Sequence, residues 1–264
     1  MFALARRRQQ AAEKQVSNGI KTQLLDTHAP NETKGDLLVD KPWNEITHML
    51  KQDLEYVRTL AGFEARTPFK KELTRKYRGV VAKLLSEHDN LDGLDIIWWW
   101  YQWQIDVGLL PLVHDDFRQA IERGLDSPQR WSSSGQTAYC DIIYKYSNDA
   151  FKQEAVYNPQ YLMKAVKDIS NGSLATNAAL KVKMFRLVGD IADKAGLYQE
   201  ALAMFGAVMS MDPTKGGRKT RLKELKEQLN HESKPEPSSS DTEEHQTDPA
   251  SGANSDGEGA VNGA

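Results

Sequence analysis

Apolar residues recur every three or four positions through most of the chain, which is the spacing of a single helix face. One such stripe begins at Trp43 and Ile46 and continues through Leu50, Leu54 and Val57. No stretch alternates convincingly for a strand, and no Asn-Gly or Asp-Gly turn joins two β-rich runs. The fold is therefore predicted to be all-α. Further helical segments are predicted over residues 69–84, 94–105, 112–121, 137–155, 159–169, 174–195, 198–211 and 215–230.

Glycine and proline mark the predicted ends of these helices. Gly62 and Pro68 bracket a break between the first two helices. The third helix is apolar almost all round and is predicted to be buried on most sides. Gly108 ends it, and Pro111 stands in the first turn of the next helix.

The segment 185–213 has the spacing of a tetratricopeptide repeat. Ala201, Phe205 and Pro213 follow Gly189 by 12, 16 and 24 residues, as that repeat requires. The small residues would let two antiparallel helices approach closely, while the aromatic residue fills the gap between them. This pattern predicts antiparallel helical hairpins with tetratricopeptide-like packing.

Residues 98–125 form a weaker copy of the same pattern. Gly108 and Phe117 are nine residues apart, and so are Gly196 and Phe205. An ordinary helical hairpin is the alternative for this copy. Hairpins of either kind usually form protein-binding surfaces or scaffolds.

The two ends of the chain differ from its middle. Residues 1–40 are predicted to be a basic arm and linker, and residues 231–264 a disordered acidic tail with eight acids and one base. Residues 41–230 between them form the predicted helical domain. Basic helices would occupy its first part, 41–90, and helical hairpins the remainder, 91–230.

The net charge of −3 is unevenly distributed along the chain, because the tail carries −7 and the remainder therefore +4. A mildly basic body is compatible with nucleic-acid binding. Cys140 is the single cysteine, which excludes an intrachain disulfide and a thiolate metal cluster. No apolar run approaches the roughly eighteen residues needed to cross a bilayer. These features predict a cytoplasmic protein that does not enter a membrane.

Residues that commonly carry catalysis are scattered. No phosphate-binding glycine loop is present, and the six histidines form no HExxH pair, so no metal site is predicted. Asp106, Asp115 and Asp116 are the least implausible catalytic acids, and Mg²⁺ would be required if they formed a nuclease centre. Asp92 and Asp95 are better interpreted as the cap and first turn of the tryptophan-rich helix. A structural role is favoured for all these acids.

Clusters of basic residues are more informative than the acids. Lys71, Arg75 and Arg78 lie within about 60° on a helical wheel, opposite an apolar stripe, where they could contact phosphates. A solvated polar face is the alternative. The candidate DNA-binding residues are Lys70, Lys71, Arg75, Lys76 and Arg78 in this helix, and Arg218, Lys219 and Arg221 near the last one.

The order of these motifs is similar to that of a known family. The motifs are the tryptophan-rich helix closing in Ile105-Asp106-Val107-Gly108, the Asp193-Lys-Ala-Gly196 turn with Ala201-Leu202, and the Gly216/Lys219/Leu222/Leu225 helix. Across residues 40–230 the chain resembles the small terminase subunits of peduovirus-type tailed phages, often labelled terminase endonuclease subunits.

The resemblance implies a DNA-packaging initiator that acts in the cytoplasm of a bacterial host. Such a protein would bind the cohesive-end site of concatemeric double-stranded DNA and direct its cleavage together with a large ATPase subunit. A homo-oligomer is also implied. The family's label places the nicking activity in this subunit, whereas the residues show no nuclease motif, so enzyme status stays open. The competing function is a tetratricopeptide-like protein-binding scaffold with no nucleic-acid role.

Overall fold

A computed structural model describes residues 38–129 and 131–232, and every regular element within those ranges is α-helical. The all-α prediction is therefore confirmed. No helix in the described ranges is both long and apolar enough to cross a membrane. The helices are α2 (Trp43–Thr59), α3 (Gly62–Glu87), α4 (Asp95–Asp106), α5 (Leu110–Glu122), α6 (Gly135–Lys152), α7 (Gln160–Asn171), α8 (Ala178–Lys194), α9 (Tyr198–Met211) and α10 (Lys219–Glu232).

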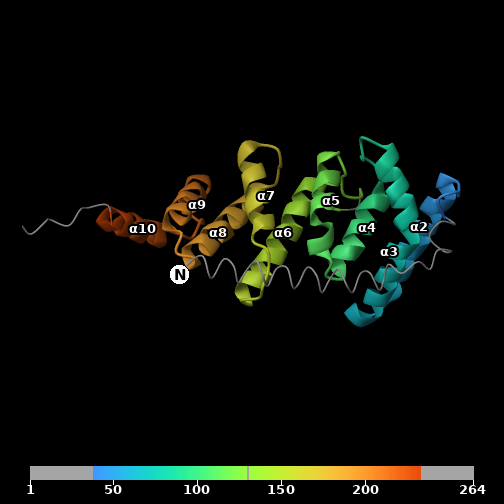
Figure 1. Cartoon of the computed structure of the whole chain (residues 1–264), viewed down its shortest axis with the longest axis horizontal. Coiled ribbons are helices and arrows are strands. Elements are labelled where there is room, and N and C mark those ends of the chain that lie inside the picture. Colours follow the sequence, from blue (N-terminus) through green and yellow to red (C-terminus); the bar gives the residue numbers. More distant parts are fainter. Residues whose placement is uncertain (1–37, 130, 233–264) are drawn as a thin grey trace, which may run out of the picture.

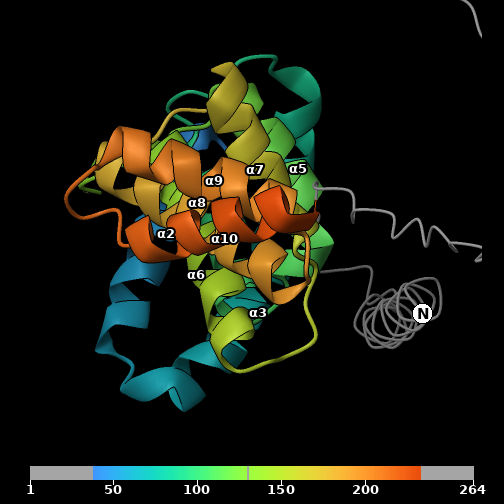
Figure 2. The ribbon, with the colours of Figure 1, turned by 90° about the vertical axis from the view of Figure 1, so that its left-hand side faces the viewer.

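The helices stack in chain order into one elongated row, with α2 and α3 at one end and α10 at the other (Figure 1). Each helix packs mainly against its neighbours in the sequence, as in helical-repeat proteins. When the row is viewed end-on, α10 lies across α8 and α9 (Figure 2). The basic arm, apart from residues 38–40, and nearly all of the acidic tail lie outside the described residues.

The tryptophan-rich helix α4 is the most deeply buried part of the row, as its sequence predicts. Trp98, Tyr101 and Trp103 are all fully buried. Phe117 of α5 packs against Trp98 and Tyr101, with ring centroids 5.6 and 5.0 Å apart. Trp131 of the α5–α6 loop closes the cluster edge-on against Trp98. One hydrophobic core then continues along the row from Leu38 to Val208.

The hairpins α4–α5 and α8–α9 turn in the same way. Gly108 and Gly196 both have a left-handed backbone conformation, with φ of 86° and 74°. In each turn the next residue donates its backbone N–H to a carbonyl five positions earlier, Leu109 to Gln104 and Leu197 to Ala192. Both turns are therefore closed by the 6→1 hydrogen bond of a Schellman motif.

Close packing between α8 and α9 depends on Gly189. A Cβ atom added there would lie 2.5 Å from Cε1 of Phe205, and Phe205 and Ala201 are both fully buried. The small and aromatic residues thus meet across the hairpin as the tetratricopeptide-like pattern predicts. The hairpin prediction is confirmed at this contact.

Two predictions about helix ends are wrong. Gly62 and Pro68 do not bracket a break, because α3 begins at Gly62 and contains Pro68. Pro68 removes one backbone donor, but it lies near the start of the helix and is exposed. Asp92 does not cap α4, since that position belongs to Leu94, whereas Asp95 does lie in the first turn.

Candidate functional site

Helix α3 presents one basic face to solvent. Lys71, Arg75 and Arg78 are all exposed, and the opposite side of the helix buries Leu73 and Tyr77. This confirms that the three cations form an exposed stripe, named the α3 basic face below. The prediction that they bind DNA stays a prediction.

Two other predicted DNA-binding residues of α3 are engaged by carboxylates of neighbouring helices. Lys70 Nζ lies 2.5 Å from Oδ2 of Asp106, and Lys76 Nζ lies 2.6 Å from Oδ2 of Asp53. The hydroxyl of Tyr77 donates to the same Asp53 oxygen, at 2.6 Å. Burial and this carboxylate raise the pKa of Tyr77, so it stays a donor. These contacts join α3 to α2 and α4, so Lys70 and Lys76 have less charge to offer phosphates.

The two arginines predicted near α10 turn back onto α8. Arg218 donates from Nε and Nη2 to both carboxylate oxygens of Asp190, at 2.7 and 2.6 Å. Arg221 does the same to Asp193, at 2.8 and 2.7 Å. Because both partners are spaced by three residues, the pairs form a two-rung ladder between the helices. This arginine ladder fixes α10 on α8.

The exposed cations of α10 are lysines. Lys219, Lys223 and Lys226 share one sector of about 60° on the helical wheel and are all exposed. The opposite part of the helix buries Leu225 against Phe205. Of these three lysines, only Lys219 is among the candidate DNA-binding residues predicted from the sequence. A wheel of α10, centred on its leucines, would have separated the three lysines from the two arginines.

The candidate catalytic acids lie in different surroundings. Asp106 accepts hydrogen bonds from Lys70 and from Gln102 Nε2, the latter at 2.7 Å. Asp115 accepts from His114 Nδ1 at 2.8 Å, and its side chain is 85% exposed. Asp116 is exposed on the same helix, α5. Across the described residues, no three His, Cys, Asp or Glu side chains converge as they would around a metal ion.

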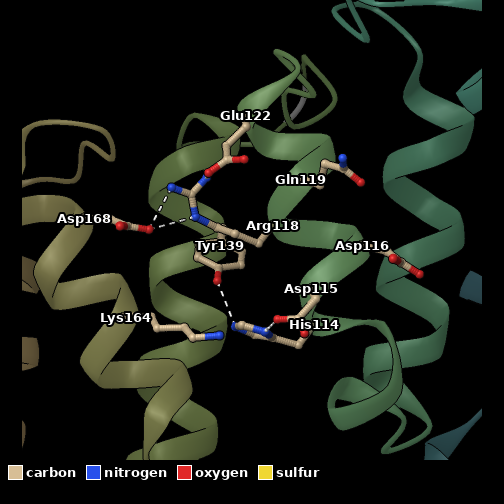
Figure 3. Close-up of a pocket in the computed structure, with 9 residues that line it drawn as sticks. All are labelled: His114, Asp115, Asp116, Arg118, Gln119, Glu122, Tyr139, Lys164 and Asp168. Carbon is tan, nitrogen blue, oxygen red and sulfur yellow. Dashed lines mark hydrogen bonds and ion pairs between the residues drawn. The ribbon is translucent and has the colours of Figure 1, made fainter.

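A cleft of about 450 Å³ is formed by α5, α6 and α7 (Figure 3). Arg118 crosses it, donating from Nε and Nη2 to Oδ2 of Asp168 at 3.2 and 2.8 Å. Its Nη1 also lies 3.0 Å from Glu122. The lining residues are His114, Asp115, Asp116, Arg118, Gln119, Glu122, Tyr139, Lys164 and Asp168.

A hydrogen-bonded chain at this cleft joins the exposed Asp115 to the buried His114 and Tyr139. His114 is almost fully buried, stacks on Tyr161 at 3.9 Å, and lies 3.0 Å from the Tyr139 hydroxyl through Nε2. Burial lowers the pKa of His114 despite the nearby Asp115 carboxylate. A neutral imidazole therefore donates from Nδ1 to Asp115 and accepts from the Tyr139 hydroxyl at Nε2. No local sequence pattern signals this arrangement, because the hydrogen-bonded residues come from α5 and α6 and the stacked Tyr161 comes from α7.

The charges of the cleft do not favour phosphate. Four carboxylates line it, against the cations Arg118 and Lys164, while His114 is neutral. Arg118 is already held by two of those carboxylates. The cleft therefore has no excess of positive charge, unlike the α3 basic face and the α10 lysines.

Comparison with known proteins gives one match. The model of a family described as phage small terminase subunit matches residues 47–177, about half of the chain. This segment runs from α2 to the residues before α8, so it contains the α3 basic face and the cleft but not α10. No curated protein and no solved structure matches the chain.

Proposed function

Because the chain belongs to the phage small terminase subunit family, and so has a role in packaging phage DNA, we propose that it initiates packaging by binding double-stranded DNA through α3. The α3 basic face carries this proposal. It lies inside the segment shared with the family, and its three cations are exposed. Arg75 is paired with Glu72 of the same helix, but both side chains are more than half exposed, so the pair neutralises little charge. Lys71 and Arg78 are seven residues apart, which places them about 10 Å apart along the helix, so the stripe can contact more than one phosphate.

The recognised DNA is the cohesive-end site of a concatemer in the host cytoplasm, and the partner is a large ATPase subunit that cleaves and translocates the DNA. Several copies of the chain would assemble on this site. The α2–α3 end of the row would face the DNA, which leaves the hairpins from α4 to α9 for contacts with other proteins.

We assign the hydrolytic step to the large subunit. Phosphodiester hydrolysis at neutral pH needs a metal-activated water or an equally strong nucleophile. In this chain Asp106 is engaged by Lys70, and Asp115 by His114, which leaves neither carboxylate poised beside a second ligand. The protein's contribution would be to position the DNA rather than to cut it.

Binding is tested with a duplex carrying the phage cohesive-end site and a shuffled duplex of equal length, each by fluorescence anisotropy. Tighter binding of the cohesive-end duplex supports the proposal. Salt-insensitive or absent binding favours the protein-binding scaffold instead, whereas equal, salt-sensitive binding to both duplexes would contradict recognition of the cohesive-end site.

Cleavage is tested with the same duplexes and Mg²⁺, with and without the large subunit. Strand scission is expected only when both subunits are present. Nicking by this chain alone, abolished in Asp115→Asn or Asp116→Asn, would instead make it an endonuclease in its own right.

A further inference from the structure

The three lysines of α10 face solvent. The arginine ladder and the buried Leu225 attach α10 to α8 and α9 from one side. This attachment turns Lys219, Lys223 and Lys226 outward. Lys223 lies 3.7 Å from Glu227, but both side chains are more than half exposed, so the pair neutralises little charge.

The sequence that continues directly from α10 is strongly acidic. Residues 233–264 contain seven acids and one base. The acids are Glu236, Asp241, Glu243, Glu244, Asp248, Asp256 and Glu258. A fixed basic helix face is therefore followed, in the same chain, by a segment of opposite charge.

We propose that this acidic segment docks on the lysine face of α10 in the same molecule and occupies it until DNA displaces the segment. The contact is electrostatic, with carboxylates taking the place of phosphates. The contact would make DNA binding selective, because weakly bound, non-specific DNA would fail to displace the segment, whereas a high-affinity site would displace it.

Chain length permits this contact. The three lysines extend over about 10 Å of helix, from Lys219 to Lys226. Residues 236–248 hold five of the acids and can extend over about 40 Å, so they can turn back and still cover the face. A tether this short gives an effective concentration on the order of millimolar, which suits a weak, reversible contact.

The α10 lysines suit this segment better than the α3 basic face does. Residue 233 follows α10 immediately, whereas α3 lies at the other end of the row (Figure 1). The regulatory consequence rests on the proposed DNA-binding function. The docking itself does not, because it can be measured without DNA.

Docking is tested in the full chain by paramagnetic relaxation. A nitroxide is attached at Gln246→Cys, and the fully buried Cys140 is protected from labelling. At 50 mM salt, amide signals of residues 219–226 are expected to broaden and to recover at 0.5 M salt. The replacement of Lys219, Lys223 and Lys226 by Ala should abolish the broadening, whereas replacement of Lys71, Arg75 and Arg78 should leave it unchanged.

Three results would overturn the proposal: no broadening at low salt, broadening of α3 instead of α10, or broadening only between a spin-labelled copy and an isotope-labelled copy. A control variant keeps the composition of residues 233–264 but shuffles their order, so that only the charge is preserved. Because the contact is electrostatic, this variant should show the same broadening as the wild type.

The effect of docking on DNA binding is tested with a full-length variant in which the seven acids of residues 233–264 are changed to the matching amides. This variant should bind the shuffled duplex about 10-fold more tightly at 50 mM salt, and equally at 0.3 M. Unchanged affinity at low salt would refute the regulatory role. If neither protein binds DNA while the broadening persists, the proposed function fails and the docking stands.

Discussion

Two glycines in the same hairpin provide a matched test of how α8 and α9 pack. An alanine Cβ at Gly189 would lie 2.5 Å from Cε1 of Phe205, 2.7 Å from its Cδ1, and 3.2 Å from Cβ of Met204. Phe205 is fully buried and cannot swing outward. At Gly206, in α9, the same Cβ meets nothing within 4 Å.

Both substitutions gain about 1 kcal/mol of helix propensity, so the difference between them isolates the steric cost. Overpacking a filled core costs about 1–3 kcal/mol. Gly206→Ala should therefore stabilise the protein, and Gly189→Ala should have a free energy of unfolding about 1–3 kcal/mol below that of Gly206→Ala. For a chain of this size that difference is about 2–10 °C in Tm.

Urea and thermal unfolding of the two variants, followed by far-ultraviolet circular dichroism, measure this difference. The wild type lies between the two variants or beside Gly189→Ala. If Gly189→Ala were as stable as Gly206→Ala, the close approach of the helices at Phe205 would be refuted, and with it the tetratricopeptide-like packing of this hairpin.

Two further predictions concern charged groups in the fold. Because burial lowers the pKa of His114 below its ordinary 6.5, the unfolded chain takes up the proton more readily, and stability should fall as the pH drops below 6.5. His114→Gln keeps an acceptor for Tyr139, and its Tm should fall less than that of the wild type between pH 7.5 and 5.5. An equal fall in both proteins would show that another group causes the pH dependence. The Arg221 guanidinium holds the pKa of Asp193 below its usual range, so this pair stabilises the fold above about pH 4 and is lost below it. Asp193→Asn should lower the free energy of unfolding at pH 7, measured by urea denaturation, by about 1 kcal/mol. An unchanged free energy would show that the arginine ladder does not stabilise α10.

Local features of the fold could be predicted from the sequence because they depend on neighbouring residues. Helical periodicity located the helices, and the glycines at 108 and 196 located two turns that require a left-handed backbone. Pro68 misled because proline usually stops a helix, yet it is accommodated in α3. Its exposed position near the helix start is a tertiary fact that no local rule contains.

The candidate site could be predicted only in part, for the same reason. A wheel identified the exposed sector of Lys71 and Arg78, but it could not show that Lys70 is paired with Asp106, 36 residues away. Arg218 and Arg221 were grouped with Lys219 by charge alone, although their partners lie 28 residues earlier, on α8. Long-range ion pairs decide which cations remain for a ligand, and they follow from the packing.

The central claim is that this small terminase subunit binds DNA phosphates through the α3 basic face. A variant with Lys71, Arg75 and Arg78 changed to Ala removes three charges. Counterion release then predicts that the slope of log K against log salt falls by about 2.7. Affinity for a duplex would fall at most about 500-fold at 0.1 M salt and about 25-fold at 0.3 M.

The control variant changes three exposed lysines on α6, α7 and α8 to Ala, at positions 152, 167 and 183, and so alters the net charge equally. Both variants are first checked for unchanged Tm. The measurement is the salt dependence of duplex binding by fluorescence anisotropy for the wild type and the two variants. A slope reduced in the α3 variant alone is the predicted result, whereas equal slopes in the two variants would contradict the assignment of DNA binding to α3.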